Sequence, residues 1–247
     1  MILRLKTVLP LVLACVSASA LYGQESAQKT RREIALGYNQ SSGNSSTREI
    51  LGRVDVELKR VDDEFKFFAE CFNSSDDGKT SAERASGAID YAYYFDTGKR
   101  WLHSFRLSGE HDRFSDIDLR SLVSTGVKYL VFKTDTLEAG ADVSVGYEYT
   151  DFYAPEHDDT DELVVVPGVF IAKNFARGVR VSQTLKFFLY PGSSDAGHRI
   201  EARTAVQSAL SERISLRLSL DNFYNSDPNP GIEEHDMRFV SSLVCSF

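Results

Sequence analysis

Cysteine is scarce in this chain of 247 residues, which contains only Cys15, Cys71 and Cys245. So low a density excludes a small secreted scaffold held together by disulfides, and packing or a closed sheet must supply the stability. The chain also lacks an apolar run of the roughly 20 residues that a membrane-spanning helix needs. It has no glycine-rich phosphate-binding loop, no paired cysteines and no basic stripe. We therefore expect no cofactor, no bound metal and no catalytic centre.

The first twenty residues have the order of a secretory signal peptide. Two basic residues precede a short apolar run, and the small residues Ala18 to Ala20 follow it, which predicts cleavage after Ala20. A competing interpretation takes Leu13, Ala14 and Cys15 as a lipoprotein box in which Cys15 carries the lipid. The sequence leaves both possibilities open.

Positive charge is in deficit along the rest of the chain. Removing residues 1–20 leaves 26 basic and 36 acidic residues, a net charge of −10. A surface this acidic argues against a nucleic-acid partner.

Alternation with a period of two dominates from residue 31 onward, which predicts strands with two chemically different faces. Residues 137–149 show it best, because apolar residues occupy every odd position while small or acidic residues occupy the even ones. The same rule places nine charged residues on the polar face of their strands, where they are expected to line a lumen: Glu138, Asp142, Glu148, Arg199, Glu201, Arg203, Arg217, Asp221 and Arg238.

Clusters of Gly, Asp, Asn, Ser and Pro divide the chain into about twelve strand candidates. Their approximate spans are 31–41, 46–59, 64–74, 81–95, 99–111, 118–132, 135–152, 162–173, 178–190, 197–209, 212–225 and 235–247. The connections alternate between long polar ones, such as SSGN, SSDDGKT and APEHDDTDE, and short ones, such as VDD and ARG. Long loops at one end of an up-and-down meander are typical of an outer-membrane β-barrel.

The predicted fold is therefore all-β, a single antiparallel transmembrane β-barrel of about 12 strands. After the signal peptide of residues 1–20 we expect a short periplasmic segment at 21–30 and the barrel at 31–247. The expected location is the bacterial outer membrane, reached by export, with the membrane lipid as a partner. Neither the oligomeric state nor the physiological role follows from the sequence.

The last strand candidate carries alternating apolar residues to the final position. An open sheet edge cannot exist in hydrocarbon, so this strand is expected to close the barrel against the first. Its outward face is also expected to be the signal that the barrel assembly machinery recognises, and this signal consists of Phe239, Leu243, Cys245 and Phe247. Cys71 and Cys245 fall too far apart on this strand map for a disulfide and are predicted to be free thiols.

Three stretches of the sequence resemble a known family. They are IALGYNQSSGNSST at 34–47, AERASGAIDYAYYF at 82–95 and DRFSDIDLRSLVSTGVKY at 112–129. Their order is similar to that in the salt-induced outer-membrane proteins, catalogued as the domain of unknown function 481 family, DUF481. The first match comprises Gly37, Tyr38, Gln40, Ser42, Gly43 and Asn44, and the second comprises Asp112, Arg113, Phe114 and Arg120. The resemblance implies an outer-membrane barrel related to salt stress and brings no agreed activity.

Histidine spacing argues against a barrel lipase, which is disfavoured here. The family pattern of those enzymes has a His and a Ser two residues apart, on the same face of one strand. In this chain His103 is followed directly by Ser104. Adjacent strand residues point to opposite faces, so His103 is interpreted as a histidine of the interfacial girdle. The acidic loop at 154–162 is interpreted as solvated, with weak cation binding as the alternative.

The expected lumen raises two possibilities that the sequence does not decide. Opposite charges are expected on opposing walls, with arginines on the last strands and acids on 135–152. These charges either pair and fill the barrel or leave a narrow hydrated path for small ions or solutes. The leading hypothesis is a non-enzymatic structural or narrow-pore envelope protein. The alternative is an adhesin-like barrel that binds through its acidic external loops.

Overall fold

The computed structural model describes residues 29–41, 47–154, 157–192 and 197–247. The expected signal peptide with Cys15, most of the expected periplasmic segment and the Ser-Gly-Asn turn at 42–44 lie outside the described residues. Within the described part, Cys71 and Cys245 are both free, as predicted, and both are exposed.

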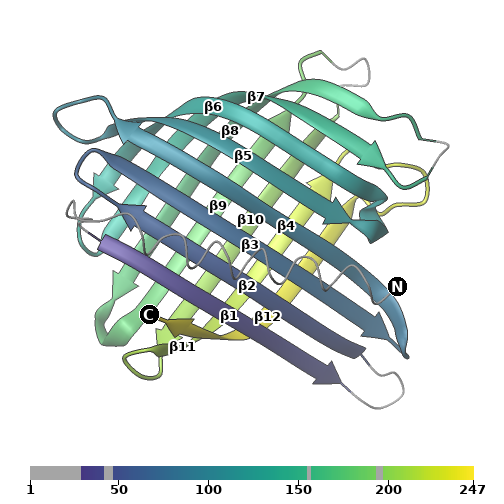
Figure 1. The fold of residues 1–247 in the computed structure, drawn as a ribbon, viewed down its shortest axis with the longest axis horizontal. Helices are drawn as coiled ribbons and strands as arrows, with labels where there is room; N and C mark the ends of the chain where they lie inside the picture. Colours follow the sequence, from purple (N-terminus) through teal and green to yellow (C-terminus); the bar gives the residue numbers. More distant parts are fainter. Residues whose placement is uncertain (1–28, 42–46, 155–156, 193–196) are drawn as a thin grey trace, which may run out of the picture.

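The described residues form twelve antiparallel strands that close into one barrel (Figure 1). The strands are β1 Lys29–Ser41, β2 Thr47–Lys59, β3 Asp63–Asp76, β4 Lys79–Tyr94, β5 Trp101–Asp112, β6 Ile117–Lys133, β7 Leu137–Phe152, β8 Thr160–Phe175, β9 Val179–Leu189, β10 His198–Ala209, β11 Ile214–Asn225 and β12 His235–Ser246. Each strand pairs with its neighbours in sequence, and β12 pairs with β1 from Ser242 opposite Gly37 to Ser246 opposite Glu33. The predicted fold class, strand number and closure are confirmed.

The barrel has two different ends. We call the end with the connections after β1, β3, β5, β7, β9 and β11 the mouth, and the end with Lys29 and Phe247 the terminal end. Figure 1 shows the front and back strands crossing with opposite tilt, as expected for strands wound around one axis. The expected segregation of long connections at the mouth holds only in part.

Two mouth connections are shorter than the sequence analysis predicted. β3 and β4 are joined by Asp77 and Gly78 alone, whose φ values of 47° and 78° fit the two-residue turn that Asp-Gly favours in hairpins. Between β5 and β6, residues Arg113–Ser115 form a single 3₁₀ turn, η1. The Asp112 carboxylate caps it by accepting the N–H groups of Phe114 and Ser115, both at 3.2 Å. Local turn chemistry therefore shortens segments whose composition alone indicated long loops.

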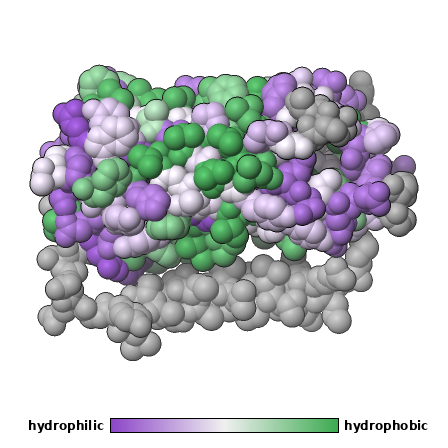
Figure 2. Space-filling view, turned by 90° about the horizontal axis from the view of Figure 1, so that it is seen from above, coloured by the Kyte–Doolittle hydropathy of each residue, from purple (hydrophilic) through white to green (hydrophobic). Residues whose placement is uncertain are grey.

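The outward face of the barrel is apolar. On β5, for example, Trp101, Phe105 and Leu107 are between 43 and 52% exposed, while Leu102 between them is fully buried. Figure 2 shows hydrophobic residues gathered in the middle of this face and hydrophilic residues toward both of its ends. The described residues contain no helix that could span a membrane. The apolar band suits contact with hydrocarbon.

The inward face mixes charge with small apolar clusters. One cluster joins Leu51, Phe72 and Val240, and a second near the terminal end joins Ala92 and Leu102 with a further leucine. A third lies on β6, β8 and β9. Large apolar side chains thus fill parts of the interior, which narrows the space left for the charged residues.

Candidate functional site: the charged lumen

The nine predicted lumen residues lie on β7, β10, β11 and β12. Six of them line the larger interior cavity: Glu148, Arg199, Glu201, Arg203, Arg217 and Asp221. Glu138 lies toward the terminal end, where its Oε2 is 2.6 Å from Lys59 Nζ. Asp142 lies beside Gly168 on β8, its partner in register. Arg238 lies opposite Asp221 in register.

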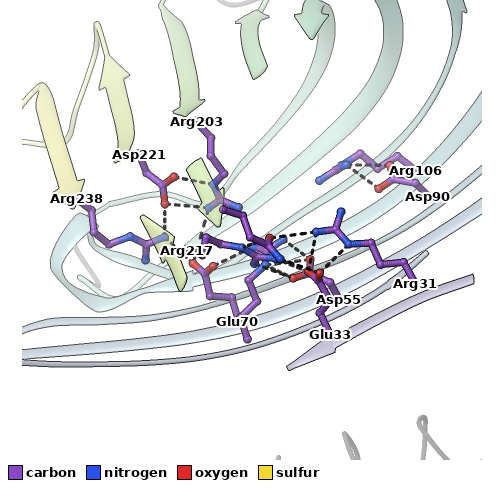
Figure 3. Close-up of polar contacts among 12 residues, drawn as sticks. Arg31, Glu33, Asp55, Glu70, Asp90, Arg106, Arg203, Arg217, Asp221 and Arg238 are labelled. Carbon is purple, nitrogen blue, oxygen red and sulfur yellow. Dashed lines mark hydrogen bonds and ion pairs between the residues drawn. The ribbon is translucent and has the colours of Figure 1, made fainter. Parts of the chain in front are cut away.

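Acids of the first three strands meet arginines of the last three strands inside the barrel (Figure 3). We call this cluster the central network, and its members are Arg31, Glu33, Arg53, Asp55, Glu70, Arg203, Arg217, Asp221 and Arg238. Arg217 on β11 contacts Glu33 on β1 and lies 3.4 Å from Asp55 on β2. Glu70 on β3 lies 2.9 Å from Arg53 and 3.8 Å from Arg203 of β10. Strands far apart around the barrel are thereby tied across its interior.

Arg238 is the most enclosed arginine of the central network, at 7% exposure. It donates to Glu70 at 2.5 Å and to Asp221 at 2.7 Å, and its guanidinium lies over the Phe72 ring at 4.8 Å. Asp221 also accepts two hydrogen bonds from Arg203, at 2.7 and 3.1 Å. Burying such charges is costly unless they are paired, so the network is held together by mutual neutralisation.

A second group of charges crosses the interior nearer the mouth. This mouth belt alternates in sign from β4 through β5, β6 and β7 to β10, and consists of Arg84, Glu110, Arg120, Glu148, Arg199 and Glu201. Its strongest contact is bidentate, because Arg199 donates to both oxygens of Glu148 at 3.0 and 2.9 Å. Tyr190 donates to the same carboxylate at 2.9 Å. The belt has equal numbers of acids and bases, and no net charge results.

Two cavities meet at the mouth belt. One of about 490 Å³ occupies the middle of the lumen, and another of about 440 Å³ lies at the mouth among residues of the β7–β8 and β11–β12 connections. All six belt residues, together with Phe223, line both cavities. The belt therefore lies at the boundary between an outer and an inner compartment.

Of the four predicted lumen arginines, most do not pair with the acids of β7. Only Arg199 reaches an acid of β7, Glu148. Arg203, Arg217 and Arg238 instead pair with acids of β1, β2, β3 and β11. The physical reason is closure, which brings the first three strands beside the last three and offers these arginines nearer carboxylates.

Sequence reasoning missed the acids of the first three strands. Glu33, Asp55 and Glu70 occupy inward positions of strands whose alternation is visible in the sequence, as in TREILGRVDVELK of β2. That alternation was the available signal. Their partners were not predictable from it, because Glu33 and Arg217 are separated by 184 residues.

His103 lies on the outward face near the terminal end, as its interpretation as a girdle residue requires. Its Nδ1 lies 3.0 Å from the Tyr93 hydroxyl and its Nε2 lies 3.0 Å from Thr125 Oγ1. Thr125 donates its own hydroxyl proton to the Ser104 carbonyl oxygen at 3.2 Å. The Thr125 hydroxyl therefore lies within hydrogen-bond distance of both the His103 ring and the Ser104 carbonyl.

The acidic loop between β7 and β8 is partly outside the described residues, since 155 and 156 are not described. His157 of this loop lies 2.6 Å from Asp116 Oδ2, and Asn229 of the β11–β12 connection donates to the same oxygen at 3.0 Å. Within the described ranges, no group of three or more His, Cys, Asp or Glu residues is arranged to hold a metal ion.

Comparison with known proteins identifies the same architecture. Residues 34–247 match a family model described as a protein of unknown function, DUF481. No curated protein matches the chain in sequence. Among solved structures, the chain is similar to the NanC porin, with 11% identity, a TM-score of 0.52 and coverage of 87% of this chain and 98% of that one. It is also similar to an outer-membrane channel from Pseudomonas putida F1, with 9% identity, a TM-score of 0.56 and coverage of 92% and 98%. At such low identity these similarities show the fold alone.

Proposed function

The chain belongs to the DUF481 family, whose description carries no activity, and from the lumen itself we propose that it is a non-enzymatic outer-membrane barrel that passes small ions or solutes through a narrow, hydrated path. The mouth faces the outside of the cell, and the terminal end faces the periplasm. The apolar outward band contacts outer-membrane lipid, and the barrel assembly machinery inserts the chain. Its physiological setting is the response of the envelope to salt.

The observation that carries this proposal is the pair of cavities that share the mouth belt. A barrel filled by paired charges would leave no continuous space, whereas here cavities of about 490 and 440 Å³ adjoin at the mouth belt. Charged groups make up the belt, and burying them without water is costly, so water is expected to occupy both compartments.

Purified barrel in a planar lipid bilayer tests the proposal. We expect small conductance steps, because the central network and the apolar clusters fill much of the cross-section. Heat-modifiable migration in gels serves as the control for folding of the same sample. An absence of conductance from folded barrel would contradict the pore and leave a structural role.

The adhesin-like alternative is separated from the pore by protease treatment of intact cells. Cleavage of the mouth connections removes a binding surface but leaves the membrane-embedded strands in place. If salt tolerance survives the cleavage, the acidic loops are dispensable, as the pore requires. Loss of salt tolerance with unchanged conductance would favour the adhesin.

A further inference from the structure

Three cations inside the barrel differ from the rest. The arginines of the central network and the mouth belt have carboxylates within ion-pair distance, as does Lys66, which lies 3.0 Å from Glu57. Within the part of the chain that the structure describes, Lys128, Arg180 and Lys186 have no such partner. Lys128 lies 5.4 Å from the centre of the Phe170 ring, and Arg180 donates only to an asparagine.

Lys186 lies at one end of a row of inward-facing positions that begins with Lys128. This row of residues paired in register crosses β6, β7, β8 and β9, and it consists of Lys128, Asp142, Gly168 and Lys186. A Cβ atom on Gly168 would lie 3.1 Å from Asp142 Oδ1, so the glycine leaves room for that carboxylate. One acid thus stands between two lysines, and the row keeps a net positive charge.

Two of the three acids that interact with Lys186 are already paired with other cations. These acids are Asp90, Asp142 and Glu201, and Glu201 lies 3.3 Å from Arg199. Asp90 holds Arg106 of β5, with both carboxylate oxygens 2.9 to 3.0 Å from the arginine Nη1. The positive potential at Lys186 therefore remains available to a mobile anion.

Hydroxyl groups surround this positive potential on the cavity wall. Ser182 and Thr184 precede Lys186 on the inward face of β9, and Ser108, Ser124 and Ser144 line the same cavity from β5, β6 and β7. Thr184 is exposed although it faces inward. Hydroxyls can donate hydrogen bonds to an anion and can also replace part of its water shell.

We propose that the wall formed by β5 to β9 is the conducting side of the lumen and that Lys186 gives it a preference for small hydrated anions. The central network occupies the opposite side, where each arginine has a carboxylate within ion-pair distance. This inference rests on the proposed pore function, and it adds the class of solute and the residue that selects it.

Reversal potentials in a potassium chloride gradient test the selectivity. Wild type is expected to favour chloride, and Lys186→Met is expected to lower the chloride-to-potassium permeability ratio by about fivefold, as loss of one charge at close range in water implies. Lys186→Arg keeps the charge and should keep the ratio. Lys173→Met is the matched control, because it removes the same charge from the exposed outward face of β8. Equal effects of Lys186→Met and Lys173→Met, or a cation-selective wild type, would overturn the inference.

A second measurement separates this inference from the pore itself. Wild type is heated in citrate and in chloride at the same ionic strength, and the temperature at which the heat-modifiable folded form is lost is compared. That temperature should be higher in citrate, because a ligand that binds the folded state stabilises it. The gain should disappear in Lys186→Met and persist in Lys173→Met. Citrate stabilisation without conductance would retain the anion site and reject the pore. Conductance that does not depend on Lys186 would retain the pore and reject the anion site.

Discussion

Glycine decides how closely β6 and β7 approach each other at the lumen wall. Gly126 lies opposite Ser144, and Gly146 lies opposite Ser124, so each serine faces a residue without a side chain. A Cβ on Gly126 would lie 2.6 Å from the Cβ of Ser144 and would also press on the carbonyl oxygen of Val143. The small residues that leave space in the lumen are therefore also required for strand pairing.

Replacing Gly126 with alanine should destabilise the barrel by about 1 to 3 kcal/mol, because the backbone of β7 would have to shift. Gly109→Ala on β5 is the matched control, since nothing lies within 4 Å of the added carbon. Its free energy of unfolding should stay within about 0.5 kcal/mol of wild type. Urea unfolding in detergent measures both variants, and equal stabilities would show that β6 and β7 are less tightly packed than described.

Asp96 organises the turn between β4 and β5 at the terminal end. It accepts backbone hydrogen bonds from Trp101 at 2.8 Å and from Arg100 at 3.0 Å. Desolvation raises the pKa of Asp96, but these hydrogen bonds outweigh it and hold the pKa below its ordinary value of 3.8. A carboxylate with a lowered pKa stabilises the folded state above its ordinary pKa, and this stabilisation is lost as pH falls through the lowered value.

Asp96→Asn should therefore be less stable than wild type at neutral pH, and the difference should shrink as pH falls below 3.8. Asp135→Asn is the control for net charge, because Asp135 lies in another terminal-end turn with a side chain that is 98% exposed. Thermal unfolding followed across pH measures the effect. Identical pH profiles for the two variants would refute the assigned role of the backbone hydrogen bonds.

At the scale of the strand, β12 has two functions, because it completes the sheet and presents one apolar outward face. Ser246 N–H donates to the carbonyl of Arg213 at 2.8 Å, and Phe247 N–H donates to the carbonyl of Arg32 at 3.2 Å. The Phe247 side chain is 59% exposed and shares the outward face with Phe239 and Leu243. Little of the contact energy of the folded barrel depends on this ring, which leaves recognition during assembly as its proposed role.

Deletion of Phe247 should therefore reduce the amount of heat-modifiable barrel in the outer membrane by far more than it reduces stability. The loss of one backbone hydrogen bond predicts a decrease of about 1 kcal/mol in refolded protein. Membrane fractionation gives the first quantity and unfolding in detergent gives the second. Phe247→Tyr keeps an aromatic ring and should assemble normally. Normal amounts of the deletion variant in the membrane would contradict the proposed signal.

At the scale of the whole molecule, closure joins the first and last strands through the central network. Arg217 is the link between β11 and the carboxylates of Glu33 and Asp55 on β1 and β2. Its side chain is 14% exposed, so it lies against the cavity without being open to bulk solvent. Removing it leaves two inward carboxylates with one cation fewer and also widens the lumen.

Arg217→Ala should shift the selectivity of the lumen toward cations and raise the single-channel conductance. Arg217→Lys retains the charge and should change both quantities less. Reversal potential and step size in planar bilayers measure the outcome, with heat-modifiable migration as the control for folding. An unchanged reversal potential in folded Arg217→Ala would mean that the charge of the central network does not act on ions passing along the β5–β9 wall.

The sequence by itself determined the strands and their faces. Alternation located all twelve strands within a few residues, because a side chain on a strand must point to one side or the other. The same rule assigned charge to the inward face, and the apolar last strand indicated closure against the first. The Asp77-Gly78 hairpin was also present as a turn signal, although its surroundings had suggested a longer loop.

Only the tertiary structure decided which inward charges meet. Alternation fixes the face of a residue, whereas its partner depends on strand register, on barrel tilt and on how far an arginine reaches over its neighbours. Arg238 therefore meets Glu70 across 168 residues, while no carboxylate among the described residues lies within ion-pair distance of Lys186. The distinction between a wall whose arginines are all ion-paired and a wall whose lysines are not arises from closure of the barrel, because closure brings distant strands within reach of one another.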